Sequence, residues 1–172
     1  MKSAYRLRQL IANLTAKPPA DDVRREVAAL LSEREQALFD GYTCADQAHT
    51  IRVLHCLRDA GYNHPDLLAA ALLHDIGKIR CPLSVWDRTV IVVGSAFFPR
   101  RTVAWGNGSL DSWRRPFVAR AQHPQWGAEM AAAAGSRPAV IDLIRRHQDK
   151  HDLMDNENDR LLAQLQWADD RS

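Results

Sequence analysis

An adjacent histidine and aspartate, His74 and Asp75, end an apolar run and are the pair in this 172-residue chain best suited to chemistry. Divalent transition metals accept imidazole nitrogen and carboxylate oxygen as ligands in proteins. An ionisable pair at the end of an apolar helix is costly to bury unless a partner compensates its polarity. The pair therefore predicts a metal site at the end of a buried helix.

Four further side chains of the same types recur at wide intervals. They are His49, His123 in His-Pro-Gln-Trp-Gly, His147 in Ile-Arg-Arg-His-Gln-Asp, and Asp169 in Trp-Ala-Asp-Asp. With His74 and Asp75 they supply four imidazoles and two carboxylates, which is enough for two metal ions. Such mixed ligation suits iron, manganese, cobalt or zinc better than calcium or magnesium.

Neighbouring residues leave alternatives open at two of these positions. Asp170 adjoins Asp169, and His151 lies one helical turn beyond His147, so either could replace its neighbour as a ligand. The remaining histidines are interpreted as surface or helix-capping groups: His55 and His64.

The order of these residues, with His-Asp-Ile-Gly-Lys at 74–78 and His-Pro-x-x-Gly at 123–127, resembles the HD-domain superfamily of metal-dependent phosphohydrolases. The resemblance runs from about Cys44 to Asp169 and is greatest to the HDIG and HD-GYP-like branch, which is all-helical and often binds two metals. The Gly-Tyr-Pro signature of that branch is absent, and Gln148 stands where the branch usually carries a second histidine. These departures argue against cyclic-di-GMP phosphodiesterase activity but not against metal-dependent hydrolysis.

The resemblance implies how two divalent metals would share the ligands. One metal would be held by His49, His74, Asp75 and Asp169, and the other by His123, His147 and a bridging Asp75. The implied reaction is cleavage of a phosphoester or phosphoanhydride, in a nucleotide or a small phosphorylated metabolite, by a metal-bound hydroxide.

Basic side chains are the candidates for binding the substrate phosphate. Lys78, the lysine of His-Asp-Ile-Gly-Lys, is the first of them, and with Asp75 it completes the predicted catalytic residues. Four arginines are weaker candidates because the sequence does not give their distances from the metals: Arg80, Arg114, Arg115 and Arg120.

Two other functions fit the same ligands. Their order also resembles the di-iron oxygenases of the superfamily, which activate oxygen rather than water. A signalling or binding module could keep metal chiefly for structure, although such a module has no evident need for six convergent ligands. Hydrolysis is the leading prediction.

Composition and charge indicate an ordinary globular domain. Apolar residues make up 46% and charged residues 26%, and the length suits one domain. A formal net charge of +2 is too small to favour a nucleic-acid partner. Three cysteines without CxxC spacing indicate reduced thiols. Because Arg6 and Arg8 interrupt any apolar stretch near the start, we expect no signal peptide and a cytoplasmic protein.

Apolar residues recur at three- and four-residue steps, which predicts an all-α fold. Three helices in residues 1–42, at about 2–14, 21–31 and 32–41, are expected to cover a catalytic core in residues 43–172. The core helices are predicted at about 43–60, 66–76, 84–94, 113–121, 125–134, 138–148 and 157–169.

The helix over residues 66–76 is apolar all round, so it should lie at the centre of the domain. Gly77 is expected to cap it, with His74 and Asp75 in its last turn.

Residues 79–122 form the least regular region and are expected to set substrate choice. A loop is predicted over residues 98–111. The apolar stretch at residues 89–98 is about half of the roughly 20 residues that span a bilayer, so no transmembrane segment is expected. A buried helix is the favoured interpretation there, with docking at a membrane surface as the alternative, because Arg88, Arg100 and Arg101 flank the stretch.

Overall fold

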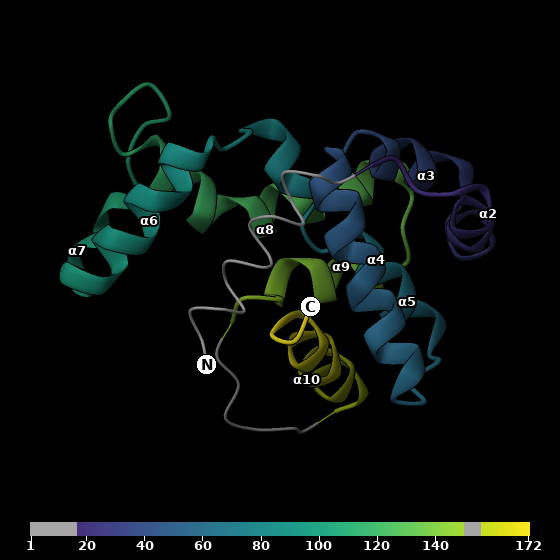
Figure 1. The fold of residues 1–172 in the computed structure, drawn as a ribbon. Helices are drawn as coiled ribbons and strands as arrows, with labels where there is room; N and C mark the ends of the chain where they lie inside the picture. Colours follow the sequence, from purple (N-terminus) through teal and green to yellow (C-terminus); the bar gives the residue numbers. More distant parts are fainter. Residues whose placement is uncertain (1–16, 150–155) are drawn as a thin grey trace.

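The computed structural model describes residues 17–149 and 156–172, and every regular element in those ranges is a helix (Figure 1). The all-α prediction is therefore confirmed. The helix predicted over residues 2–14 lies outside the described residues. The elements are α2 (Asp21–Leu30), α3 (Glu33–Asp40), α4 (Cys44–Asp59), α5 (Pro65–Leu73), the 3-10 helix η1 (Ile76–Arg80), α6 (Val85–Phe97), α7 (Pro99–Trp105), α8 (Arg115–Ala134), α9 (Pro138–Arg146) and α10 (Glu157–Asp169).

Local side-chain hydrogen bonds fix where several helices begin. Ser32 and Glu35 form a capping box at the start of α3, and Ser84 and Asp87 form another at the start of α6. Thr43 caps α4 through the backbone N–H of Asp46. These caps bond backbone N–H groups that a helix otherwise leaves without partners at its first turn.

Helix α5 lies at the centre of the domain, as its uninterrupted apolar sequence predicts. All seven residues from Leu67 to Leu73 are buried. The helix contacts α2, α3, α4, α9 and α10, which surround it with the other helices of the main core. The end of α5 is therefore held in place from several sides.

The end of α5 differs from the prediction. The helix stops at Leu73, His74 is its C-cap in right-handed conformation, and η1 follows after Asp75. Gly77 is not a left-handed cap. A Cβ atom at Gly77 would lie 1.9 Å from the backbone oxygen of His123, so glycine is required there because η1 meets α8 main chain to main chain.

Helix α8 is a single helix across the position where the sequence predicted a break. Pro124 lies inside it, and Gly135 ends it with a φ of 84°. Burial outweighs the cost of an internal proline, since His123, Pro124 and Trp126 are all buried. The prediction of two separate helices in residues 113–134 was wrong.

Two further expectations for residues 79–122 were also wrong. The predicted loop over residues 98–111 contains α7. Helix α6 forms where a helix was expected, but it is not buried: Val92, Val93 and Phe97 are exposed. Figure 1 shows α6 and α7 together at one end of the molecule, where they contact each other and α8. None of the described helices is both long and apolar enough to cross a bilayer.

Candidate metal centre

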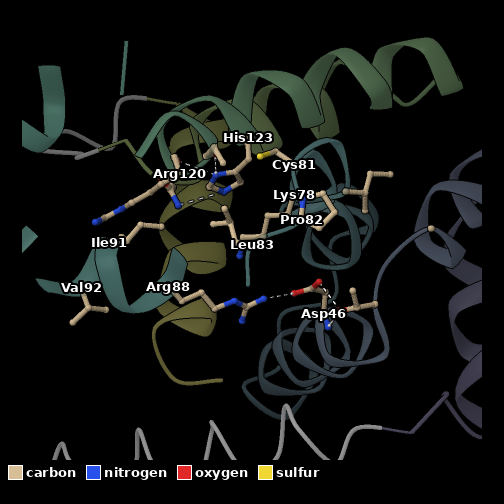
Figure 2. Close-up of a pocket in the computed structure, with 15 residues that line it drawn as sticks. Asp46, Lys78, Cys81, Pro82, Leu83, Arg88, Ile91, Val92, Arg120 and His123 are labelled. Atoms are coloured by element: carbon tan, nitrogen blue, oxygen red, sulfur yellow. Dashed lines mark hydrogen bonds and ion pairs between the residues drawn. The ribbon is translucent and has the colours of Figure 1, made fainter. Parts of the chain in front are cut away.

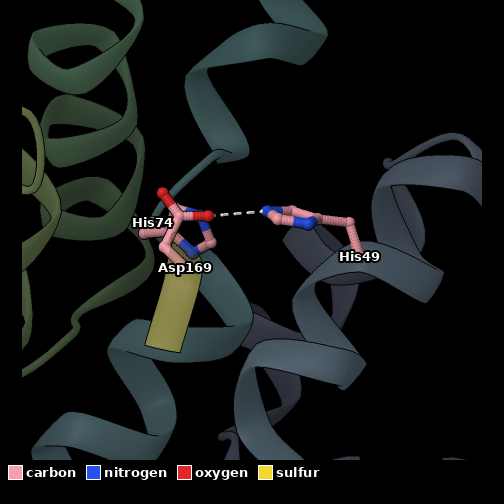
Figure 3. A group of neighbouring side chains, drawn as sticks. All are labelled: His49, His74 and Asp169. Atoms are coloured by element: carbon pink, nitrogen blue, oxygen red, sulfur yellow. Dashed lines mark ion pairs between the residues drawn. The ribbon is translucent and has the colours of Figure 1, made fainter. Parts of the chain in front are cut away.

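Six side chains of metal-ligand type meet in two groups of three. One group contains His49, His74 and Asp169, and the other contains Asp75, His123 and His147. Within each group the ligand atoms lie within 4.8 Å of one another. Figure 3 shows the first group, in which His49 Nε2 lies 3.0 Å from Asp169 Oδ1. The fold therefore brings together all six residues that the sequence analysis singled out as ligands.

Asp75 lies between the two groups and turns a different oxygen to each. Its Oδ1 is 3.3 Å from His123 Nε2 and 3.8 Å from His147 Nε2. Its Oδ2 is 3.5 Å from His74 Nε2 and 3.8 Å from His49 Nε2. One carboxylate thus faces both candidate metal positions.

Three helices end at this cluster. His74 is the C-cap of α5, His147 is the C-cap of α9, and Asp169 is the last residue of α10. The C-terminal end of a helix carries partial negative charge from its unpaired carbonyl groups. The convergence of three such ends favours a cation at this place.

Carbonyl groups at two of these helix ends orient the buried imidazoles of His74 and His147 by accepting hydrogen bonds from them. His74 Nδ1 lies 3.0 Å from the carbonyl oxygen of Ala71, and His147 Nδ1 lies 2.7 Å from that of Ile144. A carbonyl oxygen only accepts, so Nδ1 carries the proton and donates it. In the neutral ring, which is the form that binds metal, each Nε2 then has a lone pair that points into the cluster.

His123 sits in the middle of α8, where carbonyls are normally occupied by the helix itself. Its Nδ1 lies 2.9 Å from the carbonyl oxygen of Arg120. That carbonyl would ordinarily accept from the backbone N–H four residues later, but residue 124 is a proline and has none. Pro124 therefore releases the acceptor that orients His123.

The arrangement of nitrogen atoms fits a metal better than it fits a metal-free core. His74 Nε2 is buried and has no hydrogen-bond partner among the described residues. His123 Nε2 and His147 Nε2 lie 3.2 Å apart with their lone pairs facing each other. Two nitrogens each bonded to one metal at about 2.0–2.1 Å are separated by roughly 3 Å. A shared cation turns this repulsion into coordination.

Charge in the cluster also favours a cation. Burial alone would raise the pKa of Asp75, but Lys78 and His74 outweigh it and hold that pKa well below its usual range. Burial and the charge of His74 lower the pKa of His147 to about 3, so this imidazole is neutral near pH 7. Burial would lower the pKa of His74, but Asp75 and Asp169 outweigh it and raise that pKa. The negative charges of Asp75 and Asp169 therefore favour a positive charge, from a proton or a metal ion, at the His74 ring.

A cavity of about 350 Å³ opens beside the second group and is bordered by His123 (Figure 2). Two of the predicted phosphate-binding residues line it: Lys78, which also forms an ion pair with Asp75, and Arg120, which donates to Ser95 Oγ at 2.6 Å. The cavity is the place where a substrate could reach the candidate metal ligands.

The other three arginines do not line this cavity. Arg80 lies over the ring of Trp126 and 3.7 Å from Glu129. Arg115 pairs with Asp87 at 3.4 Å, and Arg114 lies over the ring of Trp113. All three interact with neighbouring side chains rather than with the cavity.

The sequence left two alternative ligands open, Asp170 and His151, and the structure describes the first of them. Asp169 belongs to the first group, whereas Asp170 is exposed at the end of α10. His151 lies outside the described residues. The remaining histidines have the predicted roles: His55 is exposed and contacts Glu26, and His64 caps α5.

Four polar residues at the cavity were missed by the sequence analysis, and Thr43 is one of them. Asp46 and Arg88 face each other across it at 3.8 Å, and Gln148 borders it next to His147. Gln148 had a signal, since it directly follows a predicted ligand. The pairing of Asp46 on α4 with Arg88 on α6 had none, because it depends on how α6 folds back over the core.

Comparison with known families gives one result. The family model described as HD domain matches residues 47–172, which is most of the chain and includes all six residues of the two groups. No curated protein and no solved structure matches the chain.

Proposed function

Because this chain belongs to the HD-domain family, we propose that it is a metal-dependent phosphohydrolase that cleaves a phosphoester or phosphoanhydride of a small molecule. The single observation that carries the proposal is the pair of three-residue groups joined by Asp75. Each group offers the mixture of imidazole and carboxylate ligands that transition metals bind.

In this proposal the two groups hold two divalent metal ions, with Asp75 serving both. His49, His74 and Asp169 hold one ion, and His123 and His147 hold the other. Metal ions bound there lower the pKa of a coordinated water and stabilise negative charge on phosphoryl oxygens. The proposal assigns iron, manganese, cobalt or zinc rather than calcium, since four of the six ligands are imidazoles.

The chain's own residues bind and orient the substrate. Lys78 and Arg120 line the cavity next to His123, so a phosphate placed there meets two cationic side chains. Gln148 lies 3.4 Å from His123 and adds an amide at the same end. Water supplies the hydroxyl group that joins phosphorus, and its proton balances the departing alcohol or phosphate.

The test is turnover by protein loaded with Mn²⁺ or Fe²⁺. Substrates should include p-nitrophenyl phosphate, bis-p-nitrophenyl phosphate and ATP, with release of nitrophenol or phosphate as the signal. We expect hydrolysis of at least one of them, and its loss in Asp75→Asn but not in His55→Ala. Full metal loading without hydrolysis, or oxygen consumption by the iron form, would contradict the proposal and favour the binding or oxygenase functions respectively.

A further inference from the structure

The cavity beside His123 has two ends of different character. Its polar end carries Lys78, Arg120 and Gln148. Its wall carries aliphatic and small side chains from η1, the segment after it, and α6: Ile79, Cys81, Pro82, Leu83, Ile91 and Val92. In the view of Figure 2, Ile91 lies to the left of Leu83, with Arg120 and His123 above them and Arg88 and Asp46 below. A ligand that fills the space meets Lys78 and Arg120 near His123, hydrocarbon along the wall, and the ion pair of Asp46 with Arg88 away from His123.

The polar end suits a phosphate group. Among the described residues no carboxylate pairs with Arg120, whose side chain donates to the neutral hydroxyl of Ser95. Arg88 differs, because Asp46 already faces it at 3.8 Å. Arg120 is therefore a cation without a carboxylate partner next to His123, where the proposed reaction takes place, and Lys78, which pairs with Asp75, is a second cationic side chain in the lining.

The wall is poorly suited to a nucleobase. Among the described residues that line the cavity there is no Phe, Tyr or Trp, and the one ring, His123, is a proposed metal ligand, so a base has no free ring to stack on. The amide of Gln148 lies at the phosphate end, and Asp46 is engaged with Arg88. The edge of a base would leave hydrogen-bonding groups without partners against Leu83 and Ile91, which is unfavourable.

We infer that the natural substrate is a phosphate monoester of an aliphatic alcohol, an inference that rests on the proposed phosphohydrolase function. The phosphate lies against Lys78 and Arg120, and the alkyl chain lies between Leu83 and Ile91. Hydrolysis breaks the phosphorus–oxygen bond, so that one water and the monoester give the alcohol and inorganic phosphate. No oxidant or further reactant is needed.

Binding of non-hydrolysable phosphonates to the metal-loaded protein tests the alkyl wall without turnover. Hexylphosphonate and methylphosphonate share a head group and differ by five methylenes, each contributing roughly fourfold in affinity if fully buried. We expect calorimetry to show hexylphosphonate binding at least 30-fold more tightly. Equal affinities, or no binding of hexylphosphonate, would overturn the inference.

Substitutions on the wall locate the effect. Ile91→Asn should reduce the preference for hexylphosphonate to below threefold and leave methylphosphonate binding unchanged, because only the chain loses its apolar contact. Val93→Asn is the matched control, since Val93 lies on the same helix but is not part of the cavity lining, and it should keep the full preference. If the two variants behave alike, the chain does not bind along this wall.

Turnover measurements distinguish a failure of the aliphatic-substrate inference from a failure of the proposed phosphohydrolase function. Hexyl phosphate should be hydrolysed with a kcat/KM at least tenfold above that of AMP. A preference for AMP would overturn the aliphatic substrate and leave phosphohydrolysis standing. Failure to hydrolyse any phosphate ester with metal bound would contradict the proposed function, whereas the phosphonate measurements would still report on the cavity.

Discussion

The Nε2 atoms of His123 and His147 lie 3.2 Å apart, although both imidazoles carry their proton on the opposite nitrogen. Two lone pairs at this separation repel each other. The backbone carbonyls that hold each Nδ1 prevent either ring from turning its N–H toward the other without losing a buried hydrogen bond. The pair is therefore arranged to bind a cation.

Removing His123 should empty one metal position and preserve the other. We expect His123→Ala to bind close to one equivalent of metal instead of two, because His49, His74 and Asp169 do not depend on it. Loss of a group that only hydrogen-bonds to a metal ligand lowers metal affinity by roughly 10–100-fold, so loss of His123 itself should lower the affinity for the second equivalent by more. Elemental analysis and Mn²⁺ titration measure both quantities.

His55→Ala is the control for this experiment, since His55 is exposed and belongs to neither group. It should keep two equivalents. Loss of both metals in His123→Ala would mean that the two groups do not bind independently, and retention of both would remove His123 from the ligand set.

Replacing Pro124 by alanine should weaken metal binding by restoring an ordinary helical hydrogen bond. The new N–H at residue 124 would compete for the carbonyl of Arg120, which now orients His123. Because this carbonyl is an outer-shell partner of the proposed ligand, we expect roughly a tenfold loss of affinity at the second position. Thermal unfolding of the metal-free variant should show no loss of stability, and a stable variant with unchanged affinity would contradict the role given to Pro124.

Lys78 should matter for turnover and not for metal retention. It pairs with the Asp75 oxygen that also faces His49 and His74, so its removal leaves that oxygen freer to bind a metal. We expect Lys78→Ala to keep its metal and lose roughly 100-fold in kcat/KM, the scale expected when a group that stabilises transition-state charge is removed.

Arg80→Ala is the matched control on the same short helix, because Arg80 contacts Trp126 and Glu129 instead of the cavity. Its kcat/KM should stay within about threefold of the wild-type value. Equal losses in the two variants would show that the effect of Lys78 is not specific to the cavity.

Glu35 should stabilise the fold in a pH-dependent way. Its buried carboxylate accepts from Ser136 Oγ at 2.6 Å and from the backbone N–H of Ser32 at 2.9 Å. Burial alone would raise its pKa, but these bonds outweigh it and lower the pKa below the ordinary value of 4.5. The stabilisation is therefore complete above about pH 4.5 and is lost as the pH falls through the lowered pKa.

We expect Glu35→Gln to reduce the free energy of unfolding by about 1–3 kcal/mol at pH 7, with a smaller difference at pH 3.5. Urea unfolding at the two pH values measures the change. Glu33→Gln, at an exposed position in the same helix, should stay within about 0.5 kcal/mol at both. A difference that does not shrink on acidification would mean that the charge of Glu35 is not the cause.

Much of the fold could be predicted because local sequence determines it. The apolar run before His74 predicted a central helix, and α3 begins within the range 32–41 predicted for a helix, where Ser32 and Glu35 cap it. Gly61 and Gly135 end helices with positive φ, as glycines at such positions are expected to do. In each case residues that are close together in the sequence are enough to predict the helix or its end.

The errors arose where distant parts of the chain decide the outcome. The sequence placed a break at His123 and Pro124, but the buried packing of α8 against η1 and α9 keeps it one helix. Gly77 was expected to act as a cap, whereas its real constraint is the backbone of His123, 46 positions later. The six ligand types were visible in the sequence, but their division between two metals was implied only by the family resemblance, because the geometry depends on where α5, α9 and α10 end.

The contact between Gly77 and the backbone of His123 has a consequence for how this protein can vary. A seam formed by two stretches of main chain contains no side chain that a mutation could enlarge, shrink or reshape. Exchanges among apolar residues elsewhere in the interior can be absorbed by neighbouring side chains, yet the spacing between Asp75 and His123 is set by the path of the polypeptide itself. The spacing should persist through extensive drift in the surrounding sequence, and a methyl group at residue 77 should be enough to disrupt it.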